Sequence, residues 1–328
     1  MNSRRITGYS NIRALACMAI VVLHTFYASI PGQDSAFSLR AGAYMVRNCM
    51  FWAVPCFVMV SGALLLDPDR DVTWRKIFRR YLRRVVTALV GFSLLFAIFD
   101  AVTSKIPFSI AVVRDWFVRL YTDTGWSHMW YLYLMIGIYL MIPFFRMITA
   151  SARKADIRML LLLLLVFLSI LPMLDKLTGA ESGFYLCVNT VYPFYLFAGY
   201  ALSKGIVRIR LRVAALLILA GAASILAVTW AGLLQESGTL TKVVGNYSFI
   251  GVIMLAAGMF EFIRKRSKQK HPVLTAILAA VDRYSFGVYL VHMLYLKLAV
   301  VVLGLDFTRY GGLLAAWPPA SSFSCSHS

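Results

Sequence analysis

Two ionisable residues, Arg13 and His24, lie eleven positions apart in the first apolar stretch of the chain. In an α-helix this spacing is about 20° beyond three full turns, with a rise of about 16 Å, so both side chains lie on one helix face. An arginine at one end of such a face suits an anionic ligand, and a histidine deeper in a membrane can act as a general base on a hydroxyl. The alternative is an arginine that only marks topology and a histidine that packs against a neighbouring helix. The spacing alone does not choose between them.

A second group of candidate binding residues lies in segment 74–84, whose sequence is Trp-Arg-Lys-Ile-Phe-Arg-Arg-Tyr-Leu-Arg-Arg. Guanidinium groups bind phosphate through two parallel hydrogen bonds, so this density of arginines could hold the phosphates of a nucleotide-like ligand. Basic loops beside a membrane also act as topology signals or as anchors for anionic lipid, and the cluster taken alone favours that interpretation.

Two further histidines and one segment of small residues lie inside apolar stretches. His128 opens the fourth stretch, where amphipathic side chains often lie at the membrane interface. His292 falls about 12 Å into the last stretch, so it needs a hydrogen-bond partner there and fits a contact between helices. Segment 55–62, Pro-Cys-Phe-Val-Met-Val-Ser-Gly, predicts a kink and a close approach of helices rather than catalysis.

Composition defines the elements that must position these residues. Of 328 residues, 60% are hydrophobic and 14% are charged, whereas soluble domains are about 45–50% apolar and about 25% charged. Crossing a bilayer core of about 30 Å takes about 20 mostly apolar residues per helix. The sequence therefore predicts an all-α, polytopic helical membrane protein. The first run, 12–30, is too long for a cleaved signal peptide and is expected to be the first helix.

About nine transmembrane helices are expected, at 12–30, 48–66, 85–103, 128–148, 159–175, 185–203, 211–234, 245–263 and 284–304. With a cytoplasmic N-terminus, 23 of the 33 lysines and arginines fall in segments that face the cytoplasm, and 8 fall outside. This asymmetry follows the positive-inside rule, so the N-terminus is predicted to be cytoplasmic.

The same distribution explains the net charge of +19 as topological, with no nucleic-acid partner. The five cysteines are scattered without a Cys-x-x-Cys pair, so neither a disulfide framework nor a metal site is predicted. No Walker, nucleophile-elbow, His-Glu-x-x-His or Rossmann pattern is present.

Two segments outside the apolar runs are unusual. The outer loop, 104–127, mixes acidic and aromatic residues that could bind a substrate, although an interfacial aromatic belt is the favoured interpretation. Segment 317–328 begins with Trp-Pro-Pro and is rich in serine, which does not continue a membrane helix. We therefore expect one transmembrane domain over 1–316, followed by an atypical tail, truncated or frame-shifted, over 317–328.

Together these patterns resemble the bacterial membrane-bound acyltransferase-3 family, whose members are O-acyltransferases of cell-surface glycans and related acceptors. The resemblance runs from Tyr9 to about Leu305. Each motif is weak alone, and their order and sidedness carry the resemblance. The motifs are the arginine-to-histidine pair of the first helix (Arg13, His24), the second-helix segment ending in Ser-Gly (55–62), the cytoplasmic Arg-x-x-Arg (Arg80, Arg83), and the signatures at 128–132 and 284–292.

The resemblance implies a function and roles for five residues. An acyl group, acetyl first, would pass from cytoplasmic acyl-CoA to a hydroxyl of a glycan, a lipid-linked sugar or a similar acceptor. The phosphates of CoA would bind near Arg80, Arg83 and Arg13, and His24 and His128 would be the catalytic histidines. The implied location is a bacterial plasma membrane among membrane lipids, without a metal. The family usually has a tenth helix, which this chain is expected to lack after Ala316.

Two other classes remain open on the residues alone. A transporter or flippase of a glycan or lipid intermediate would also use intramembrane charges, although no pair of broken helices in corresponding halves supports it. A catalytically silent membrane domain is the third. The acceptor, the acyl length and the oligomeric state, including a homo-oligomer, are not encoded in any motif.

Overall fold

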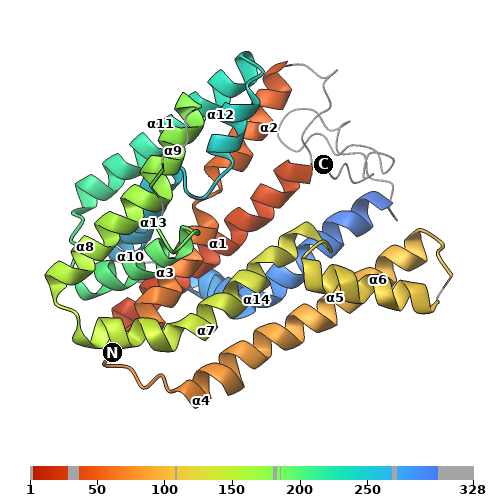
Figure 1. Ribbon diagram of the computed structural model, residues 1–328, viewed down its shortest axis with the longest axis horizontal. Coiled ribbons are helices and arrows are strands. Elements are labelled where there is room, and N and C mark those ends of the chain that lie inside the picture. The colour runs from red at the N-terminus through yellow and green to blue at the C-terminus, as the bar shows by residue number, and fades with distance from the viewer. Residues whose placement is uncertain are drawn as a thin grey trace. The chain divides into compact units, whose positions relative to one another are not determined.

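The computed structural model describes residues 3–28, 37–107, 109–179, 183–184, 186–267 and 272–301, and every regular element among them is a helix (Figure 1). The predicted all-α class is therefore confirmed for this part of the chain. The tail at 317–328 and the expected place of a tenth helix lie outside the described residues.

The chain divides into two compact units. Among the described residues, unit 1 comprises those within 3–64 and 152–289, and unit 2 comprises those within 65–151 and 290–301. The long helix α14, Pro272–Val301, contributes its first part to unit 1 and its last part to unit 2. Each unit is described by itself below.

Unit 1 contains most of the helices. Besides the first part of α14, they are α1 (Ser3–Ala28), α2 (Phe37–Cys49), α3 (Ala53–Leu65, of which the last residue belongs to unit 2), α8 (Lys154–Leu165), the π-helical turn η3 (Val166–Ile170), α9 (Leu171–Thr178), α10 (Tyr192–Lys204), α11 (Leu211–Leu234), α12 (Gly238–Val244) and α13 (Ile250–Arg266).

The core of unit 1 forms around α10 and α13. Nine consecutive residues of α10, Tyr195 to Ser203, are buried, and α13 packs along α11. Gly62 of α3 lies against the backbone of Leu196, and Gly199 of α10 lies against the backbone of Met59, so a Cβ at either glycine would collide with main-chain atoms. This is the close approach predicted for segment 55–62. Pro55, for which a kink was expected, lies in the first turn of α3, where proline fits a helix.

Unit 2 contains α4 (Trp74–Lys76), the π-helical turn η1 (Ile77–Leu82), α5 (Arg83–Thr103), α6 (Ile110–Thr122), the 3₁₀ turn η2 (Ser127–Met129), α7 (Trp130–Ser151) and the end of α14. Arg146 of α7 holds the connection that precedes α4. Its guanidinium donates to the carbonyl oxygens of Leu65 and Asp67, both at 2.7 Å, and of Arg70 at 2.8 Å. Thr149 Oγ1 adds a bond of 2.7 Å to the carbonyl of Leu66. Arg146 and Thr149 therefore order the backbone carbonyls of this connection.

Seven helical stretches among the described residues are long and apolar enough to cross a membrane: Thr7–Tyr27, Phe37–Leu65, Trp74–Thr103, Ser127–Ser151, Lys154–Thr178, Leu211–Leu234 and Val273–Ala299. The other two predicted spans correspond to α10 and α13, which have 13 and 17 residues. Both are shorter than the roughly 20 residues that span a bilayer. The middle parts of both helices are buried in unit 1, and short helices at membrane depth are tolerated where protein surrounds them.

Segment 104–127, predicted to be an outer loop, contains the helix α6, and two of its tryptophans bond to α5. Trp116 Nε1 donates to Ser93 Oγ at 3.1 Å, and Trp126 Nε1 donates to Asp100 Oδ2 at 2.8 Å. Burial raises the pKa of the Asp123 carboxyl, which ends α6 in a left-handed conformation. The loop is therefore ordered by contacts to α5.

Candidate active-site residues

Arg13 of α1 is bound to a carboxylate of α14. Its Nε donates to Asp282 Oδ1 at 2.6 Å and its Nη2 donates to Oδ2 at 2.8 Å, while Ser10 Oγ donates to Oδ2 at 2.7 Å. This two-point pairing fixes the plane of the guanidinium. An arginine has five N–H donors, so three remain after Asp282 is satisfied. Arg13 is thus oriented by Asp282 and keeps donors for a second anion.

His24, on the same helix, is half-buried, and the bond it makes assigns its tautomer. Its Nδ1 lies 3.1 Å from the carbonyl oxygen of Ile20, one turn earlier. Because a carbonyl oxygen only accepts, Nδ1 carries the proton in this contact and Nε2 is the basic nitrogen of the neutral ring. His24 can therefore receive a proton at Nε2 while its ring stays anchored to α1.

Arg80 and Arg83 lie where the helix changes its winding. Arg80 is in η1 and Arg83 opens α5, so the Arg-x-x-Arg segment crosses the end of a π-helical turn. Such turns are frequent at functional sites. Both side chains are exposed, and neither forms a hydrogen bond or an ion pair within the described part of the chain. Their guanidinium groups are available to a phosphate.

His128 is buried among aromatic rings of unit 2. It is 1% exposed, and its ring centroid lies 5.4 Å from that of Phe96 and 5.3 Å from that of His292, which it meets edge to face. The protein therefore encloses His128, and its expected position at the membrane interface stays a prediction. His292 is 5% exposed and makes the contact between helices that its depth predicted.

An ion pair, not singled out from the sequence, lies next to these histidines. Lys297 Nζ of α14 donates to Asp100 Oδ1 of α5 at 2.6 Å, while Trp126 Nε1 bonds to the other oxygen of Asp100. Nζ also lies 4.4 Å from the centroid of the Trp126 ring, which stacks on Phe96 at 4.0 Å. The only sequence feature that pointed to this ion pair was the position of Lys297 within the last apolar run. These residues hold the rings that surround His128.

A family profile described as an acyltransferase domain matches residues 6–325. The chain belongs to the acyltransferase-3 family. No curated protein and no solved structure matches it. Membership establishes acyl transfer as the general activity and an acyl donor as a substrate. With its membrane-length helices, the chain is a multi-pass membrane acyltransferase.

The five predicted site residues of this acyltransferase divide between the units, two in unit 1 and three in unit 2. Unit 1 holds Arg13 and His24, separated by about 16 Å along α1. Unit 2 holds Arg83 at the start of α5 and His128, which contacts Phe96 thirteen residues further along that helix. Thirteen residues are about 20 Å of helix, so the arginines and His128 occupy different parts of unit 2. None of the predicted roles is tested by this placement.

No group of three or more histidine, cysteine or acidic residues with the geometry of a metal site occurs in the described ranges. Cys17, Cys49, Cys56 and Cys187 are free thiols, and Cys325 lies outside the described residues.

Proposed function

We propose that this acyltransferase moves an acyl group, acetyl in the first place, from acyl-CoA on the cytoplasmic side to a hydroxyl of a cell-surface glycan, a lipid-linked sugar or a similar acceptor. The proposed location is the bacterial plasma membrane. Family membership supports acyl transfer, and the observation that carries the mechanism is the anchored ring of His24, with Nδ1 bonded to the carbonyl of Ile20.

The donor is proposed to bind through its phosphates. Arg80 and Arg83 offer exposed guanidinium groups without competing bonds among the described residues. Arg13 offers the donors that Asp282 leaves unused. Charge-assisted bonds from guanidinium to phosphate are short and about twice as strong as neutral ones, so they are suited to binding a substrate at a membrane face.

The chemical step is proposed to use His24 as the general base. Nε2 takes the proton of the acceptor hydroxyl while the oxygen attacks the carbonyl carbon of the thioester. The new C–O bond forms and the C–S bond breaks, so the thiolate of CoA leaves and receives the proton from the imidazolium. Free CoA and an O-acyl ester are the products, and His24 returns to its neutral form.

His128 is proposed to orient the acceptor. Its ring is held by Phe96 and His292, so its position in unit 2 is defined before a ligand arrives. A fixed imidazole can bind a sugar hydroxyl and limit its rotation, which lowers the entropic part of the barrier.

The test is release of free thiol from acetyl-CoA by purified full-length protein in detergent. We expect His24→Asn to lower turnover by about 10²–10⁴-fold, because it removes Nε2 and leaves an amide near the position of Nδ1. We expect Arg80→Ala/Arg83→Ala to raise KM for acetyl-CoA by at least about ten-fold. Arg75→Ala/Arg79→Ala, which removes two exposed charges of the same segment, is the matched control and should keep KM within about two-fold.

Full turnover of a folded His24→Asn variant would show that His24 is not the base. Absence of thiol release and of acetyl-CoA binding by folded wild type would contradict the proposed donor. If the two double variants had equal KM values for acetyl-CoA, Arg80 and Arg83 would have no special part in donor binding, and segment 74–84 would be a topology signal only.

A further inference from the structure

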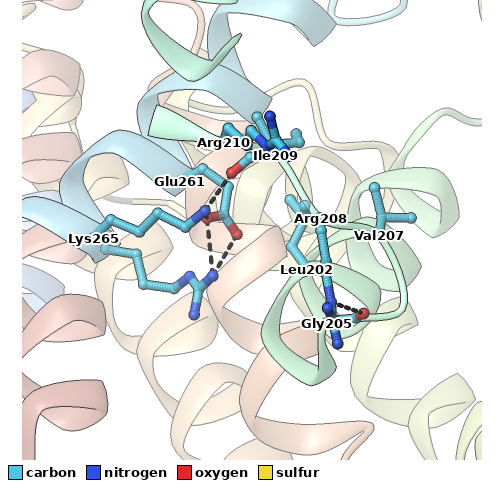
Figure 2. A pocket seen from close by; sticks show the side chains of 9 residues that line it. Leu202, Gly205, Val207, Arg208, Ile209, Arg210, Glu261 and Lys265 are labelled. Carbon is cyan, nitrogen blue, oxygen red and sulfur yellow. Dashed lines mark hydrogen bonds and ion pairs between the residues drawn. The ribbon is translucent and has the colours of Figure 1, made fainter. Parts of the chain in front are cut away.

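Unit 1 has a pocket at the end of α10 and α13, of about 430 Å³. This volume lies within the range of about 300–1,000 Å³ that holds small-molecule ligands. Figure 2 shows the connection between α10 and α11, with Arg208 and Arg210, on one side and the last turns of α13, with Glu261 and Lys265, on the other. Both segments belong to the basic set that the sequence predicts to face the cytoplasm.

The acidic residue of this pocket is fully engaged by two of its four cations. The side chain of Glu261 is 1% exposed, and it accepts from Arg264 Nη2 at 2.6 Å and 2.9 Å, while Lys265 Nζ lies 3.3 Å from Oε2. Lys265 also donates to the carbonyl of Ile209. Glu261 therefore fixes Arg264 and Lys265 in place.

The other two cations are not neutralised. The guanidinium of Arg210 has neither a hydrogen bond nor an ion pair among the described residues, and that of Arg208 bonds only the nearby carbonyl of Gly205, at 3.3 Å. Four cationic groups against one carboxylate leave a pocket with a formal charge of +3. The Nε of Arg264 is buried and has no hydrogen-bond partner in the part of the chain that is described.

The backbone adds donors at the same place. α11 begins after Arg210, which does not cap it with its side chain, so the first N–H groups of a 24-residue helix have no partner within that helix. An anion at a helix N-terminus is stabilised by these groups and by the helix dipole. The start of α11 adjoins the pocket, whose lining ends at Arg210 and includes arginine side chains, which bind phosphate in a two-point manner.

We propose that this pocket binds a phosphate ester, through Arg208, Arg210 and the start of α11. Basic segments that served only as topology signals would need no cavity between them and no buried carboxylate to fix Arg264 and Lys265. The chemistry is shared by the phosphate of a soluble nucleotide and by that of an anionic lipid headgroup. This site differs in residues from the Arg80 and Arg83 pair and does not depend on the acyl transfer proposed above.

The experiment measures binding of two probes to full-length protein in a zwitterionic detergent. One probe is adenosine 3′,5′-bisphosphate, and the other is phosphatidic acid in mixed micelles, with phosphatidylcholine as the neutral lipid. Each titration is run in wild type and in the Arg80→Ala/Arg83→Ala background, so that phosphate bound by that pair is separated from phosphate bound by the pocket.

We expect Arg208→Gln/Arg210→Gln to weaken binding of one probe by at least about ten-fold in both backgrounds. Arg208→Lys/Arg210→Lys should have an intermediate affinity, because lysine keeps the charge but cannot form the two parallel hydrogen bonds of a guanidinium. The control Arg153→Gln/Lys154→Gln removes two exposed charges at α8 and should stay within about two-fold of wild type. Loss of nucleotide binding identifies a soluble ligand, and loss of phosphatidic acid binding identifies a lipid.

No saturable binding of either probe by folded wild type overturns the proposal, and so does equal affinity in the Gln and control variants. Folding of each variant is checked by its melting temperature. Thiol release is measured in a separate assay. If the protein shows His24-dependent turnover but its pocket binds neither probe, the proposed function stands and only this binding site is ruled out.

Discussion

At the scale of single residues, the pairing of Arg13 with Asp282 determines what Arg13 can bind. One edge of the guanidinium is filled by the carboxylate, and Ser10 holds the same carboxylate from the other side. The side chains are 32% and 14% exposed, so the pair is partly removed from water. An arginine held in this way presents its remaining donors in a fixed direction.

We expect Asp282→Asn to destabilise unit 1, because it leaves the Arg13 charge without its counter-ion at a partly buried position. The expected loss is about 1–3 kcal/mol. The measurement is the free energy of unfolding by denaturant in one fixed detergent. The matched control is Asp71→Asn, whose pair with Lys76 is 3.6 Å long with the aspartate 83% exposed, and which should change stability by less than about 1 kcal/mol. Equal effects of the two substitutions would mean that the Arg13 pair contributes no more than a surface pair.

At the scale of elements, the sequence predicted where helices lie along the chain better than it predicted which helices contact one another. Apolar runs located α1, α5, α7, α11 and α14 because a membrane helix is defined by length and composition. The contact of His128 with His292 joins residues far apart in the chain, and their spacing carries no signal of it. The π-helical turn at Arg80 was not predicted either, because a change in winding leaves the apolar pattern almost unaltered.

The ion pair between α5 and α14 should couple those helices energetically. In a cycle of Asp100→Asn, Lys297→Gln and the double variant, we expect a coupling energy of about 0.5–1.5 kcal/mol. The pair is one-third exposed, at 34% and 28%, so the coupling should be below that of a fully buried pair. The same cycle on Asp115 and Arg119, an exposed pair within α6, should give a value near zero. Unfolding free energies of all variants provide both cycles, and a null result for the first would leave the rings around His128 supported by packing alone.

At the scale of the whole molecule, burial explains why two of the nine predicted spans are short. α10 and α13 were predicted as spans because they are apolar, but apolar composition is shared by a helix that faces lipid and one that is enclosed by protein. In unit 1, Gly199 of α10 lies against the backbone of Met59 and Gly258 of α13 lies against that of Ala214, so both helices pack closely on other helices. The number of spans is therefore a property of packing as well as of sequence.

We expect Gly199→Ala to prevent correct packing of unit 1, because its Cβ would overlap the backbone of Met59 and backbone cannot move aside as a side chain can. The expected result is loss of the monodisperse species in size-exclusion chromatography. Gly137→Ala, in α7, is the control: its Cβ would meet no atom within 4 Å. That variant should remain folded, with a stability within about 1 kcal/mol of wild type. A folded Gly199→Ala protein with unchanged melting temperature would contradict the close packing of α3 and α10.

The bonds made by Arg146 and Thr149 have a consequence for how this chain can vary. They lie near the end of the continuous segment Leu65–Ser151, and they bind carbonyls at its beginning, so the two ends of the segment meet. A segment whose entry and exit meet can be exchanged for one of different length without altering the path of the chain on either side. The segment that carries Arg80, Arg83 and His128 is closed at its ends by these bonds, and it also contacts the end of α14, where His292 meets His128 and Lys297 pairs with Asp100. A segment of different length would have to keep those two contacts to leave α14 in place.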